Sequence, residues 1–223
     1  MVPCPLGAQG QSNLSHEELQ KWLDMTEQAR NALQQGDLQL ANRLFSDLML
    51  GTFRKMQSLD LSPKDRLTKL EQDAPAGGVD RFYALADLAK AAFAAGDYNV
   101  AESHANELLK LAPGYRDDWN FGNAIFFGNM IIGRVVLKRD NDVARAKAAL
   151  MASGNAKSSP QLASFGPNMS LADDLLKRGE RESVIEFFTA CKKIWTLHPE
   201  KLDSWIATVK GGGTPEWGAS LNY

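Results

Sequence analysis

The chain has 223 residues, of which 44% are hydrophobic and 23% are charged, and its formal net charge is -2. This composition is that of an ordinary globular protein long enough to bury a sizeable core. The small net charge excludes a global attraction to nucleic acid or anionic lipid. No apolar run reaches the roughly 18 residues that a membrane span needs. We therefore expect a soluble protein without nucleic-acid partner or membrane insertion, either cytoplasmic or exported with its signal peptide absent from this sequence.

The N-terminal quarter predicts a tail followed by helices. Residues 1–14 are small, polar and rich in helix breakers, which is typical of a flexible tail. Ser15 is followed by acidic residues that suit a helix N-terminus, and apolar residues then recur at helical spacing until Gly36. A second apolar face follows, and Pro63 opens one more short helix. Residues 15–72 are therefore expected to hold a first helical hairpin and a short helix.

The next region carries the clearest repeat unit. A linker is predicted at 73–79 (DAPAGGV), before a set of helical repeats at 80–210. Apolar residues mark one helix from Phe82, a turn follows at Gly96, and a second helix ends near Pro113. This unit, and above all its stretch GDYNVAESHANELLKLAP, resembles one repeat of the tetratricopeptide (TPR) family.

When the sequence is aligned on the turn at Gly96, similar turns are predicted at about residues 36, 139 and 179. The resemblance implies an all-α protein, an α-solenoid of about four antiparallel helix–turn–helix hairpins. The hairpins are unevenly spaced, and only the unit with its turn at Gly96 carries a specific motif. An irregular loop at 152–170 is expected between the last two hairpins, and a tail at 211–223, with Trp217 in it, is expected to dock on the body.

The C-terminal half carries a second resemblance. The segments SPQLASFGPNMSLA and PEWGASL, together with a helix rich in glycine and asparagine, resemble uncharacterised bacterial helical-repeat proteins over residues 122–221. This resemblance implies a shared structural unit and brings no activity with it.

The sequence offers little catalytic chemistry. The three histidines, His16, His104 and His198, have no metal-ligand spacing and are expected on the surface. The adjacent carboxylates at 117–118 and 173–174 point about 100° apart on a helix, so capping explains them better than acid–base catalysis. We predict no enzyme activity, catalytic residue, cofactor or metal. Two cysteines, Cys4 and Cys191, could form one disulfide, but a buried thiol at Cys191 and an exposed thiol at Cys4 are the favoured interpretation.

Stacked repeats expose their first helices in a concave groove, where a peptide or protein segment is the expected partner. Basic residues beside aromatic rings there suit a peptide with an acidic group. Buried amides on the predicted helix 117–138, with polar residues of the 152–170 loop, either pin the loop to the helix or contact a ligand. The predicted partner-binding residues are Arg30, Tyr83, Lys90, Phe93, Asn120, Asn123, Asn129, Gln161, Ser164 and Asn168.

Two alternatives to a protein-interaction scaffold stay open. The first is a small-molecule binding protein or enzyme, with a pocket between helix 117–138 and the 152–170 loop. The second is a structural subunit that self-associates through Trp195, Trp205 and Trp217.

Overall fold

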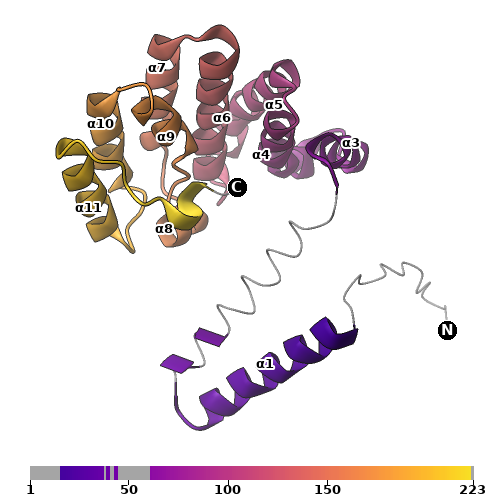
Figure 1. Ribbon diagram of the computed structural model, residues 1–223. Coiled ribbons are helices and arrows are strands. Elements are labelled where there is room, and N and C mark those ends of the chain that lie inside the picture. Colours follow the sequence, from indigo (N-terminus) through magenta and orange to yellow (C-terminus); the bar gives the residue numbers. More distant parts are fainter. Residues whose placement is uncertain (1–15, 38, 41–42, 45–60, 222–223) are drawn as a thin grey trace, which may run out of the picture. The chain divides into compact units, whose positions relative to one another are not determined.

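The computed structural model describes residues 16–37, 39–40, 43–44 and 61–221, and within them the chain is all-α, without a strand. The chain divides into two compact units, Met1–Asp60 and Leu61–Tyr223 (Figure 1). The predicted tail at 1–14, with Cys4, and most of the predicted second helix lie outside the described residues.

The N-terminal unit contains helix α1, His16–Gln34. Ala29 and Ala32 are buried on it, and Arg30 is exposed. The helix is followed by a turn in which Gly36 has a φ of 77°, a left-handed conformation that favours glycine. The prediction of a helix broken at Gly36 is therefore confirmed.

The C-terminal unit holds the remaining helices that the structure describes. Among the described residues, no helix is both long and apolar enough to cross a membrane. In chain order these helices are α3 (Pro63–Asp73), α4 (Gly78–Ala94), α5 (Tyr98–Leu111), η1 (Ala112–Tyr115), α6 (Phe121–Val135), η2 (Val136–Asp140), α7 (Val143–Gly154), α8 (Pro160–Phe165), α9 (Ser170–Leu176), α10 (Arg181–Cys191), α11 (Pro199–Lys210) and η3 (Gly218–Leu221).

Consecutive helices pack against one another in antiparallel fashion from α3 through α7, and α10 packs against α11 (Figure 1). The predicted turns explain the reversals. Gly96 has a φ of 79°, and the side chain of Asp97 caps α5 by accepting from the Val100 N–H. The turn near residue 139 is formed by η2, one turn of π-helix, and by Asn141, which follows it with a φ of 56°. Gly179, with a φ of 85°, precedes α10.

Two boundaries differ from those expected. The 152–170 segment is not irregular throughout, because α7 continues to Gly154 and α8 forms inside it. Ser159 caps α8 by accepting from the Leu162 N–H, and Pro160 occupies the first turn, so a start signal was present in the sequence. The predicted linker at 73–79 does not separate the two units. The chain divides after Asp60, and α3 and α4, on either side of residues 74–77, pack together.

The C-terminal segment docks on α9, α10 and α11. The Trp217 indole is buried against Phe188 and Trp205, and its Nε1–H donates to Asp173 Oδ1 at 2.8 Å. The Ser220 carbonyl accepts from the Met169 N–H at 2.8 Å. A buried indole that donates to a carboxylate combines apolar burial with a charge-assisted hydrogen bond, which holds this tail in place.

Helix α6 approaches its neighbours at glycines. A Cβ atom on Gly128 would collide with the Leu109 side chain of α5, and one on Gly133 would collide with Leu171 of α9. At the start of α6, a Cβ on Gly122 would collide with the carbonyl oxygen of Lys157. The backbone at Lys157 therefore packs directly on the first turn of α6.

We expect Gly122→Ala to lower the free energy of unfolding by about 1–3 kcal/mol, because a methyl group there overpacks a backbone contact that cannot rotate away. Gly114→Ala is the matched control, since no atom lies within 4 Å of its added Cβ. Urea unfolding of the full chain measures both variants. Equal stabilities of the two variants would contradict the close approach.

Candidate functional site

The predicted groove residues of α4 contact α6 and the turn before it, through three pairs of side chains. Tyr83 lies against Trp119, with ring centroids 5.5 Å apart. The Lys90 ammonium lies 3.9 Å from the centroid of the Phe127 ring. The Arg134 guanidinium lies 4.4 Å from the centroid of the Phe93 ring. We call the surface made by these six residues the α4–α6 face.

The order of these three pairs shows how the two helices run. From one pair to the next, residue numbers rise together on α4 and on the 119–134 segment, so α4 and α6 run in the same direction. Helix α5 packs against both and runs the opposite way. Two helices of like direction therefore present adjacent rows of side chains to one face.

The first pair is fixed by a carboxylate. The Tyr83 hydroxyl donates to Asp118 Oδ2 at 2.7 Å, and Asp118 Oδ1 accepts from the Asn120 N–H at 2.7 Å. The pKa of Tyr83 is raised from its ordinary value, chiefly because its hydroxyl donates to the Asp118 carboxylate. These bonds attach the turn before α6 to α4, yet Trp119 remains 50% exposed.

The cations of the other two pairs are also in ion pairs. Lys90 Nζ lies 3.1 Å from Asp87 Oδ1, and Arg134 Nε lies 2.8 Å from Asp174 Oδ2 of α9. Each cation therefore contacts an aromatic ring and a carboxylate at once. This use of Lys90 within the protein differs from its expected role of binding an acidic peptide.

The buried amides form a network that joins α6 to α8. Asn123 Nδ2 donates to Asn120 Oδ1 at 2.9 Å and to Gln161 Oε1 at 3.0 Å, and Asn123 Oδ1 accepts from the Ser159 hydroxyl at 2.5 Å. Asn120 and Asn123 are buried. Of the two roles considered for these amides, the observed one is pinning the 152–170 segment to the helix, with Ser159 as a member that the sequence did not indicate.

The other predicted residues are not brought into this network by the hydrogen bonds described. Asn129 Nδ2 donates to the Ile125 carbonyl at 2.8 Å, and Asn168 Oδ1 accepts from the Ser170 N–H at 2.9 Å. Ser164 is exposed on α8, and Arg30 is exposed on α1 in the N-terminal unit. The amides expected to line a ligand pocket thus bond to one another, to Ser159 or to the backbone.

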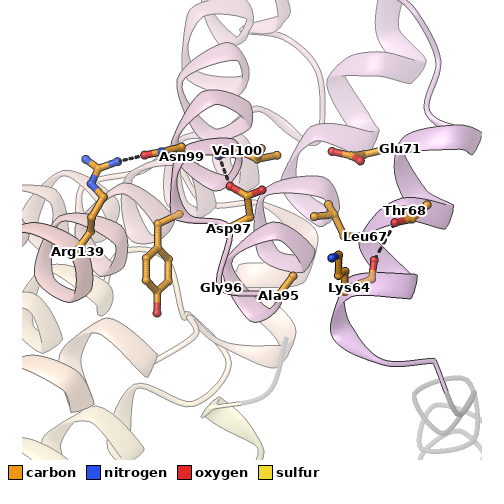
Figure 2. Close-up of a pocket in the computed structure, with 11 residues that line it drawn as sticks. Lys64, Leu67, Thr68, Glu71, Ala95, Gly96, Asp97, Asn99, Val100 and Arg139 are labelled. Carbon is orange, nitrogen blue, oxygen red and sulfur yellow. Dashed lines mark hydrogen bonds between the residues drawn. The ribbon is translucent and has the colours of Figure 1, made fainter.

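A pocket of about 600 Å³ lies elsewhere in the C-terminal unit, between α3 and the α4–α5 turn (Figure 2). Its wall includes Lys64, Glu71, Asp97, Asn99 and Arg139, and none of the predicted site residues. Figure 2 shows Arg139 directed to Asn99, to which it donates at 2.9 Å, and Asp97 directed to the backbone of Val100. These polar groups stabilise the turns that carry them.

The tryptophans proposed for self-association lie inside the unit. Trp195, Trp205 and Trp217 are each less than 10% exposed, with 3%, 4% and 7% of their surface accessible. They pack around one another, with Trp205 in ring contact with both of the others. As core residues, they are not a surface for a second copy.

His104 is more buried than the sequence indicated, whereas Cys191 is buried as expected. His104 was expected on the surface, but its side chain is only 14% exposed, 3.8 Å from Glu71 Oε1 of α3. Neither of its ring nitrogens has a hydrogen-bond partner among the described residues. Burial lowers the pKa of His104, and the nearby Arg81 guanidinium lowers it further. Cys191 is a fully buried thiol whose pKa is raised by burial.

Three of the six residues of the α4–α6 face were not predicted from the sequence. Trp119, Phe127 and Arg134 were not selected, although a tryptophan among charged and polar residues just before a helix (RDDWN) is a signal for an exposed aromatic. Phe127 and Arg134 are spaced seven residues apart, which places them on one side of α6. The spacing of Tyr83 and Lys90 on α4 is the same.

Compared with protein families, curated proteins and solved structures, the chain matches none of the three.

The lowered pKa of His104 predicts a pH-dependent stability. The unfolded chain binds a proton at this residue near its ordinary pKa of 6.5, and the folded chain does so only at lower pH. The free energy of unfolding should therefore fall as the pH falls below about 6.5. Urea unfolding between pH 7 and pH 5 measures this, and His104→Gln should flatten the dependence.

The matched control is His198→Gln, because His198 is exposed. That variant should keep the slope of the wild type. A His104→Gln variant with the wild-type slope, or a protein that becomes more stable as the pH falls, would contradict the assignment.

Proposed function

We propose that helices α4 to α11 form a short TPR-like α-solenoid that acts as a protein-interaction module. Its partner is a peptide or a segment of another protein, which binds on the α4–α6 face. The observation that carries this proposal is the half-exposed Trp119, held against Tyr83 at the edge of this face.

The arrangement of helices supports the solenoid. Helix α4 packs on both α5 and α6, α6 packs on α7 and α9, and α7 packs on α10. Both helices of the α4–α5 hairpin thus contact α6. In the next hairpin, α6 contacts α9 and α7 contacts α10. Repeats stacked in this way present their first helices side by side, and such a surface binds extended segments in many repeat proteins.

The exposure of Trp119 supports binding at this place. The other three tryptophans whose side chains are described are buried, whereas Trp119 is 50% exposed. An exposed tryptophan contributes little to the core, and tryptophan and tyrosine are the residues most enriched among those that dominate binding energy at interfaces. The bonds of Asp118 to Tyr83 and Asn120 hold the ring in place before a partner arrives, which lowers the entropic cost of binding.

The docked tail limits where a partner can bind. Ser170 of α9 donates to the Leu221 carbonyl at 3.2 Å, and Trp217 covers Asp173 of the same helix. The third helix of the expected groove is therefore occupied in part by the chain itself. A bound segment is confined to α4, α6 and the turn that carries Trp119.

Selection of short peptides from a random display library against the full chain tests this function. We expect binders whose affinity falls by about tenfold or more in Trp119→Ala, because the variant loses a preorganised aromatic contact. Isothermal titration of the selected peptides measures the affinities. Circular dichroism of the variant verifies that the helices are retained.

Phe165→Ala is the matched control, since Phe165 is an aromatic residue of α8 that is 82% exposed. It should leave the affinities of the same peptides unchanged. Peptides that lose affinity only in Phe165→Ala, or a selection without any binder that depends on Trp119, would remove the α4–α6 face as the binding site.

A further inference from the structure

The two segments that carry Tyr83 and Trp119 hold more carboxylates than cations after their ion pairs are taken into account. Arg81 bonds to Glu107 of α5 through two nitrogens, at 2.9 and 2.6 Å, and Lys90 pairs with Asp87. The charges that remain in the first two turns of α4 and in the turn before α6 are three carboxylates, Asp80, Asp117 and Asp118, and one cation, Arg116.

Two of these carboxylates act directly on the aromatic pair. Asp118 accepts from Tyr83 and from the Asn120 N–H, which are both neutral donors. Asp80 is close enough for its charge to raise the pKa of Tyr83. The negative charge of Asp118 thus lies beside an exposed indole ring and is not matched by the two groups that donate to it.

From this combination we infer that the partner segment presents a lysine or arginine side chain to Trp119. The inference rests on the proposed function and names the chemistry of its partner. The face of an indole ring is the strongest of the aromatic side chains in attracting a cation. A cation over Trp119 also lies within the field of Asp118 and Asp80, and a charge-assisted hydrogen bond to either carboxylate then orients it.

The same face disfavours an acidic segment. Lys90 and Arg134, the cations of this face, already contact Phe127 and Phe93 and pair with Asp87 and Asp174. An incoming carboxylate has to break these contacts and then lies near the carboxylates of the first pair. A basic side chain needs no such rearrangement.

Chemically matched peptides test this inference. In the selected peptides, each lysine is replaced by norleucine, which keeps the four-carbon chain without the ammonium group. Each arginine is replaced by citrulline, which keeps the length of the side chain without its charge. We expect one replacement to weaken binding to the wild type by about tenfold, as isothermal titration measures. In Trp119→Leu, the same replacement should change the affinity by less than about threefold, because the cation has lost its ring.

Asp118→Asn gives an independent readout with a small change in shape. It should reduce the preference for the charged peptide and flatten the decrease of affinity with added salt. Phe165→Leu should keep the full preference. Peptides that depend on Trp119 but bind equally well after neutralisation would overturn the inference and leave the proposed function intact.

A direct probe makes the test independent of the selection. N-acetyl-lysine methylamide and its Nζ-acetyl analogue are titrated into the full chain labelled with ¹⁵N, at constant ionic strength. The indole N–H signal of Trp119, assigned by its loss in Trp119→Phe, should shift with the charged compound only. Equal shifts with both compounds, or no shift with either, would overturn the inference whether or not peptide binders exist.

Discussion

The close approach of α6 to the helices around it is the constraint on which the rest of the C-terminal unit depends. Glycine at 128 and 133 leaves no Cβ between α6 and the side chains of Leu109 and Leu171. Helix α6 therefore packs on α4, α5, α7, α8 and α9. Because packed interiors tolerate little added volume, these glycines set the distance and the rotation of α6 relative to its neighbours.

The α4–α6 face follows from that placement. Once α6 is fixed against α5, Phe127 and Arg134 of α6 lie beside Lys90 and Phe93 of α4, and Trp119 of the preceding turn lies beside Tyr83. At the start of α6, Asn123 bonds to Ser159 and Gln161 of the 152–170 segment. One side of the start of α6 thus anchors α8, and the adjacent turn, 116–120, attaches Trp119 to α4.

The features predictable from sequence are those set by local chemistry. The turn at Gly96 and the cap at Asp97 need only a left-handed residue and a side-chain acceptor, and both occur as expected. The link between Asn123 and Gln161 was considered because buried amides need partners. Which loop residue joins them depends on where α8 starts, so Ser159 takes part and Ser164 does not.

Features set by the contacts of distant elements were not predictable. His104 has the spacing of a surface residue on α5, but its side chain is only 14% exposed and lies 3.8 Å from Glu71 of α3. Trp119 has the character of a core residue, and it stays half exposed because Asp118 holds its turn at the edge of α4. In both cases, a contacting residue, Glu71 or Tyr83, lies more than 30 residues away in the sequence.

The adjacent carboxylates of α9 connect the face to the tail. Asp173 accepts from Trp217 and pairs with Lys177, whereas Asp174 pairs with Arg134. Neighbouring residues of a helix point about 100° apart, so one carboxylate holds the docked tail and the next holds the third pair of the face. Because both bonds fix the same short helix, the tail that covers α9 also helps to position Arg134 over Phe93. The helix that holds the docked tail therefore also holds the Arg134 end of the α4–α6 face.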